Sequence, residues 1–150
     1  MKFLRNLQLL ATMLSIVFLV ACVAQPIYNV DDAMIVSSTN KTLSKEDVKS
    51  AIIQAGTTRG WVIKENSPGN LVGTLFIRKH MAKIDIQYNE KFYSINYKDS
   101  ENLSYQNTLI HKNYNNWVKN LQQDIEIQLN LMTLWSLVGR WNRAACFIGK

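Results

Sequence analysis

The sequence lacks the local patterns that usually mark catalysis. Its only two histidines, His80 and His111, are far apart and have no cysteine pair nearby, so a zinc site of the usual spacing is not indicated. It also lacks a glycine-rich phosphate loop, a Gly-x-Ser-x-Gly turn and a His-Glu-x-x-His helix. We therefore predict no catalytic residue, no metal and no cofactor. Because a Ser-His-Asp triad assembles in space, a periplasmic hydrolase with an unidentified serine and histidine is the competing interpretation.

The chain also lacks a block of basic residues. It has 17 lysines and arginines against 11 aspartates and glutamates, a formal net charge of +6, but the positive charges are scattered. A nucleic-acid-binding arm needs such charges clustered, so we expect no nucleic-acid partner. The modest excess would suit an anionic membrane surface or a polysaccharide.

The longest apolar run lies at the N-terminus. It begins near Leu7, follows the basic start Met1-Lys2-Phe3-Leu4-Arg5, and ends at Leu19-Val20-Ala21-Cys22. A basic region, an apolar region of about 14 residues and small residues before a cleavage point are typical of a secretory signal peptide. The alternative is an uncleaved anchor, because residues 7–24 form an almost uncharged stretch of about 18 residues, near the lower limit for crossing a bilayer. Both interpretations place the rest of the chain outside the cytoplasm.

Composition divides the chain into four parts. Residues 1–21 are the predicted signal peptide. Residues 22–43 contain Pro26 and a polar run, show no sustained period, and are predicted to be a tether, although the apolar segments 27–30 and 33–36 could dock as strands. Residues 44–130 are predicted to form one α+β domain, and residues 131–150 an apolar C-terminal extension.

Hydrophobic periodicity predicts the α+β fold. Ser44 is placed to cap a helix that runs from Lys45 to about Ala55, with Gly56 as its stop. The period then changes from 3.6 to 2 residues, and turn signals separate four strands within residues 61–64, 71–79, 81–88 and 92–97. A long helix begins near Asn113. We expect a four-stranded antiparallel meander with the two helices packed on one face.

The long C-terminal helix carries two apolar stripes. The first includes Val118, Leu121 and Ile125 and should pack on the sheet. The second begins at Ile127, about 200° around the helix from Ile125, and continues through Leu131, Leu134, Val138 and Trp141. This second stripe predicts a further contact. The candidates are a folded-back tail, a partner such as an envelope protein or a second copy of the chain, and a membrane surface.

Aromatic residues gather around the predicted sheet. Trp61, Tyr88, Tyr93 and Tyr97 belong to this set. One interpretation is an aromatic core whose hydroxyls reach the rim of the domain. The other is a shallow aromatic groove for a glycan or a peptide strand, because rings with polar tips suit such ligands.

Leu19-Val20-Ala21-Cys22 resembles the lipobox of bacterial lipoproteins. Three further segments are similar to a group of short, uncharacterised lipoproteins of Gram-negative bacteria. They are Pro26-Ile27-Tyr28-Asn29-Val30, Tyr97-Lys98-Asp99-Ser100-Glu101-Asn102-Leu103 and Ile110-His111-Lys112-Asn113-Tyr114-Asn115-Asn116-Trp117-Val118-Lys119-Asn120-Leu121.

The resemblance implies cleavage before Cys22 and acyl chains, palmitate among them, on the Cys22 thiol. Only Cys146 would then be free, so no internal disulfide is expected. Val23 after the lipidated residue is similar to lipoproteins sorted to the outer membrane. The implied protein is a lipid-anchored, non-catalytic binding or scaffolding module that faces the periplasm.

Overall fold

The computed structural model describes the backbone of residues 24–36 and 42–145, and within these ranges the side chains up to residue 134. The predictions for the signal peptide, Cys22 and Cys146 lie outside the described residues, as do the side chains of Val138 and Trp141. The elements are β1 (Ala24–Pro26), β2 (Val30–Met34), α2 (Lys45–Thr58), β3 (Val62–Ser67), β4 (Asn70–Ile77), β5 (His80–Tyr88), β6 (Phe92–Glu101), β7 (Leu109–His111) and α3 (Lys112–Ala145).

The protein has an α+β fold with antiparallel sheets. Strands β3 to β6 form the predicted meander, because tight turns join the four strands and alternate residues of β4, β5 and β6 are buried. The prediction of a single four-stranded sheet is wrong. Strand β2 pairs with β6 and makes a five-stranded sheet of order β2-β6-β5-β4-β3, while β1 and β7 form a separate two-stranded sheet.

The segment interpreted as a tether supplies β1 and β2, two of the three strands outside the meander. In β1, Ala24 pairs with His111 and Pro26 with Leu109. The buried side chain of Asn115 holds the segment to α3, because its amide nitrogen donates to the Pro26 carbonyl at 2.8 Å and its oxygen accepts from the Tyr28 backbone N–H at 2.9 Å. The folded body therefore begins at Ala24, well before residue 44.

Helix α2 begins and ends at recognisable caps. The Ser44 hydroxyl accepts from the Asp47 backbone N–H at 3.1 Å, and the Asp47 carboxylate accepts from the Ser44 backbone N–H at 3.1 Å, which completes a capping box. Gly60, at φ +81°, ends the helix in a left-handed conformation, with the Trp61 N–H donating to the Gly56 carbonyl at 2.9 Å.

Gly56 is not the stop that the sequence predicted. It lies inside α2, at a buried position where an added Cβ would collide with Ile63 Cδ1. The glycine is needed there for the close approach of β3 to the helix, and not for a left-handed backbone conformation.

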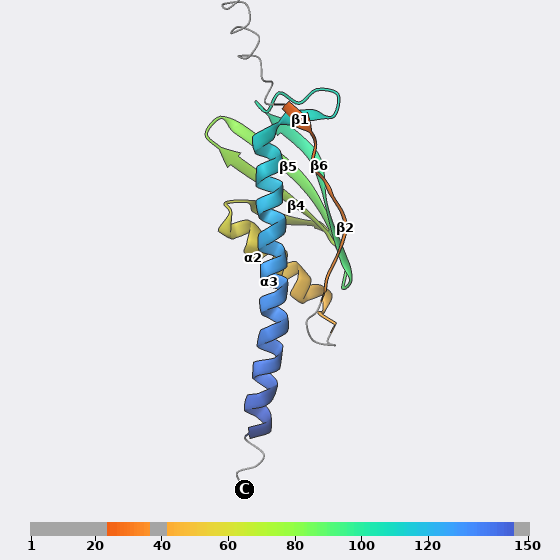
Figure 1. Cartoon of the computed structure of the whole chain (residues 1–150), viewed down its shortest axis with the longest axis vertical. Coiled ribbons are helices and arrows are strands. Elements are labelled where there is room, and N and C mark those ends of the chain that lie inside the picture. The colour runs from red at the N-terminus through yellow and green to blue at the C-terminus, as the bar shows by residue number, and fades with distance from the viewer. Residues whose placement is uncertain (1–23, 37–41, 146–150) are drawn as a thin grey trace, which may run out of the picture.

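Both helices contribute to one core on one face of the large sheet. The core joins Val48 and Ile52 of α2, Ile84 of β5, and Leu121 and Ile125 of α3, all with no exposed surface. Figure 1 shows α2 crossing behind α3 on the same side of the sheet. Neither α2 nor α3, the two helices among the described residues, covers the outer face of the sheet (Figure 1).

An ion pair joins the end of α2 to α3. Arg59 donates to both carboxylate oxygens of Asp124, with Nε to Oδ2 at 2.5 Å and Nη2 to Oδ1 at 2.9 Å. The hydrogen bonds from Arg59, and then its positive charge, lower the pKa of Asp124, and the same contact raises the pKa of Arg59. Two-point contact fixes the angle between the two helices better than a single bond would.

Helix α3 is the longest element, with 34 residues and a length of about 51 Å. Its first half covers the sheet, and its last turns extend beyond both α2 and the strands (Figure 1). Strand β1 lies beside the N-terminal end of this helix, because it pairs with β7, which immediately precedes α3. The point at which the chain enters the folded body is thus far from the projecting end of α3.

Within the described residues, no helix combines the length and the apolar character needed to cross a bilayer.

Candidate functional site

Among the aromatic residues predicted as a binding site, Tyr88 and Tyr93 are partners across β5 and β6 and both line a hollow of about 540 Å³, which Trp61 and Tyr97 do not line. Trp61, Tyr88 and Tyr93 are all buried, and Tyr97 is partly buried. Trp61 lies against Gly73 of β4, whereas the Lys45 ammonium stands 5.8 Å from the centre of the Tyr88 ring at the start of α2. The structure therefore brings two of the four predicted residues together and not all four, and the burial of Trp61, Tyr88 and Tyr93 agrees with the aromatic-core interpretation.

Two tyrosines differ in surroundings although both lie on β6. Burial, with a smaller contribution from the nearby Glu126 carboxylate, raises the pKa of Tyr93 beneath the middle of α3. Tyr97 packs at the start of α3, with its ring centre 4.6 Å from that of Tyr105 and 5.6 Å from that of Tyr114. Burial also raises the pKa of Tyr97 and of Tyr114. These hydroxyls therefore stay protonated at neutral pH and act as packing groups.

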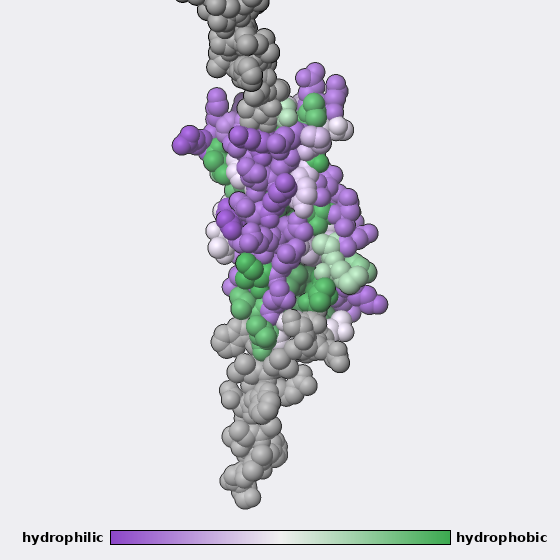
Figure 2. All heavy atoms as spheres, in the orientation of Figure 1, coloured by the Kyte–Doolittle hydropathy of each residue, from purple (hydrophilic) through white to green (hydrophobic). Residues whose placement is uncertain are grey.

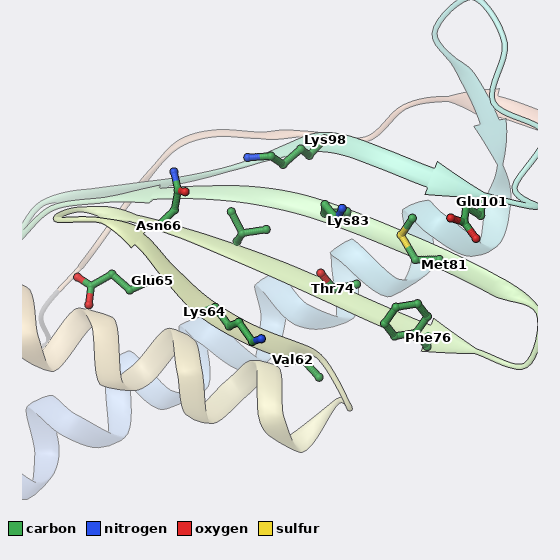
Figure 3. Close-up of a pocket in the computed structure, with 11 residues that line it drawn as sticks. Val62, Lys64, Glu65, Asn66, Thr74, Phe76, Met81, Lys83, Lys98 and Glu101 are labelled. Atoms are coloured by element: carbon green, nitrogen blue, oxygen red, sulfur yellow. The ribbon is translucent and has the colours of Figure 1, made fainter.

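The uncovered face of the five-stranded sheet carries a shallow groove of about 650 Å³. Figure 3 shows side chains from β3, β4, β5 and β6 lining it. Its apolar part includes Val62 and Phe76, which are 53% and 69% exposed, and Met81. Such exposure is unusual on the outer face of a sheet, where polar residues normally alternate with the core. The remaining lining residues are Lys64, Glu65, Asn66, Val72, Thr74, Lys83, Lys98 and Glu101.

Charges of both signs surround this groove. The Lys98 ammonium donates to Asp85 at 2.9 Å, and the Lys83 ammonium is 4.0 Å from Asp99. Lys64 makes no ion pair within the described residues. An apolar floor edged by paired and unpaired charges can bind an extended segment through side-chain contacts, and β3 adds a free sheet edge beside it.

Neither histidine forms a catalytic arrangement with its described neighbours. The His80 ring contacts the Asn102 carbonyl at 2.7 Å, and the His111 ring accepts from the Asn113 backbone N–H at 3.2 Å. Neither ring bonds to a serine or a carboxylate in the part of the chain that the structure describes. No group of three or more His, Cys, Asp or Glu side chains gathers there in a way that would hold a metal ion.

The second stripe of α3 faces away from the core. Ile127, Leu131 and Leu134 are 46%, 40% and 49% exposed, although Ile125 and Leu129 on the opposite side of the helix are buried. Figure 2 shows hydrophobic surface around the lower described turns of α3, whereas the turns above are hydrophilic. Met34, the last residue of β2, and Val36 just beyond it add exposed apolar surface across a hollow of about 190 Å³ that Glu126 and Asn130 also line.

Comparison with known proteins gives no relative for this chain: no protein-family model, no curated protein and no solved structure matches it.

Sequence reasoning missed the groove on the open face of the sheet. The available signal lay in β4, where Val72, Thr74 and Phe76 alternate with the buried residues Leu71, Gly73 and Leu75. Two of these three outward positions are apolar, which is more than a solvent-facing strand requires.

Proposed function

We propose that this protein is a lipid-anchored, non-catalytic binding module of the cell envelope, held on the outer membrane through Cys22 and facing the periplasm. The observation that carries the proposal is the sequence Leu19-Val20-Ala21-Cys22 at the end of an apolar N-terminal run. A single acyl chain binds a membrane only marginally, whereas the several chains of a lipoprotein-type cysteine anchor a domain stably.

The fold supports a short connection between anchor and domain. Ala24 is the second residue after Cys22 and is already paired with His111. Two residues span at most about 7 Å, so a lipid on Cys22 would hold the β1–β7 end of the domain close to the bilayer surface. Under this proposal the domain is held close to its anchor, because Ala24 of β1 is only the second residue after Cys22.

The anchor is tested on the full chain extracted from membranes. The expected intact mass corresponds to residues 22–150 plus acyl chains, and Cys22→Ala should remove the acyl mass and move the protein to the soluble fraction. Cys146→Ala is the matched control, because it removes the other cysteine and should leave mass and location unchanged apart from the substitution. An unprocessed mass, with the Cys22→Ala protein still in the membrane, would replace this proposal by an uncleaved anchor.

The groove on the open face is the surface that we assign to ligand binding, for an extended peptide segment of an envelope protein. Its support is the exposed apolar pair Val62 and Phe76 beside the free edge of β3. A photoreactive residue at Thr74 should cross-link a partner in intact envelopes, and Val62→Glu should abolish that product. The same probe at Gln54, an exposed residue of α2, is the control. Equal products from Thr74 and Gln54 would contradict the assignment.

A further inference from the structure

The apolar side of α3 changes direction along the helix. In the first half, Val118, Leu121 and Ile125 face the core and are buried, while Asn116, Asn120 and Gln123 occupy the outward positions. In the second half the outward positions are Ile127, Leu131 and Leu134. The core-side positions that follow in the sequence are the polar residues Ser136, Arg140 and Arg143. The projecting half is thus built to pack against something on the side away from its own domain.

The spacing of the outward residues is that of a coiled coil. Ile127, Leu131, Leu134, Val138 and Trp141 follow one another at intervals of four, three, four and three residues. This alternation keeps an apolar seam facing a partner helix, in the pattern of the a and d positions of a heptad. The backbone is helical over the whole interval, to Ala145. Residues 131–145 therefore do not fold back over the stripe.

The residues beside the seam carry no charge. In the heptad that Leu131 and Leu134 define, the flanking positions are occupied by Gln128, Asn130, Trp135, Leu137, Asn142 and Ala144. Two identical seams can therefore meet without like charges opposing one another.

We propose that two copies of this protein pair through the stripe from Ile127 to Trp141 as a parallel two-helix coiled coil. The orientation rests on the proposed function, because lipids on both Cys22 residues reach one membrane only when the two β1 ends lie on the same side. The stripe is short for a coiled coil in solution. Confinement of both copies to one membrane raises their effective concentration and favours the pair.

Disulfide cross-linking of the full chain in native membranes tests both the partner and the orientation. In a Cys146→Ser background, Leu134→Cys lies at the centre of the stripe and should form a dimer linked through residue 134 under mild oxidation. Ile127→Cys lies near one end of the stripe. It meets its own counterpart only in a parallel pair, because an antiparallel pair would place it opposite Trp141. Ser136→Cys is the matched control, one half-turn around the helix from Leu134, and should give no linked dimer.

Each outcome decides the proposal. The parallel pair is supported if Leu134→Cys and Ile127→Cys both give linked dimers and Ser136→Cys gives none. A linked dimer from Leu134→Cys but not from Ile127→Cys would show that the pair is not parallel. If Leu134→Cys gives no more linked dimer than Ser136→Cys, the stripe does not pack against a second copy. Protection of Leu134→Cys from a water-soluble maleimide without any dimer would indicate lipid contact instead. The intact mass at Cys22, measured on the same samples, shows separately whether the anchor proposal holds.

Discussion

Two isoleucines on α3 provide a matched test of which side of the helix is buried. Ile125 has no exposed surface, whereas Ile127, two residues later, is 46% exposed. Ile125→Ala removes three buried carbons, worth about 2.4 kcal/mol at about 0.8 kcal/mol each, and the cavity left behind raises the expected loss to about 3–4 kcal/mol. Ile127→Ala removes the same atoms from a surface position and should change the free energy of unfolding by less than about 1 kcal/mol.

The measurement is urea unfolding of residues 22–150 carrying Cys22→Ala, at a protein concentration low enough to keep the chain monomeric. For a domain of this size, a loss of about 3 kcal/mol also lowers Tm by roughly 10 °C, which gives an independent thermal check. Equal losses for the two variants would refute the placement of α3, as would an Ile125→Ala protein within about 0.5 kcal/mol of the parent.

Three further predictions concern local features. Ser44→Ala should cost about 1 kcal/mol of unfolding free energy because it removes the cap of α2, whereas an unchanged urea midpoint would mean that the cap contributes nothing. Gly69→Ala should cost about 1 kcal/mol or more, since Gly69 has φ +88° and an added Cβ would lie 3.2 Å from the Tyr88 carbonyl oxygen; Gly69→Asn, which tolerates this conformation better, is the comparison. Arg59 lowers the pKa of Asp124 below its ordinary value of 3.8. The unmodified protein should therefore be more stable than Asp124→Asn, with the full difference in unfolding free energy above pH 3.8 and its loss as the pH falls through the lower pKa of the folded state. A pH-independent difference between these two proteins in unfolding experiments would contradict the ion-pair assignment.

The sequence predicted the elements whose signals are local. The meander follows from alternation and turn residues within about forty residues, and the start of α2 follows from the spacing of Ser44 and Asp47. Strand β2 was missed as a firm element because its partner is β6, far along the chain, and because Asp31 and Asp32 interrupt its apolar pattern. A segment with so little periodicity becomes a strand only when a sheet edge is present to receive it.

The remaining differences come from tertiary contacts. The sequence analysis took Gly56 as the helix stop, whereas the structure places Ile63 against Gly56 and gives the positive φ to Gly60. The aromatic residues were ambiguous for a similar reason, because the same tyrosines suit a core and a groove. Their burial depends on where α3 crosses the sheet, and periodicity does not encode that position.

The pairing of the N-terminal strands has a consequence for the order of folding. Ala33 pairs with Tyr93 across 60 residues, and Ala24 pairs with His111 across 87 residues, whereas the meander closes through short turns. Loop closure over long separations is slow, so the meander should form first and the N-terminal segment should dock last. In a chain exported from its N-terminus, the N-terminal segment emerges first and stays unpaired until β6 and β7, its pairing partners, have also emerged. Under the proposed anchor, Cys22 would stay accessible to processing enzymes throughout that interval.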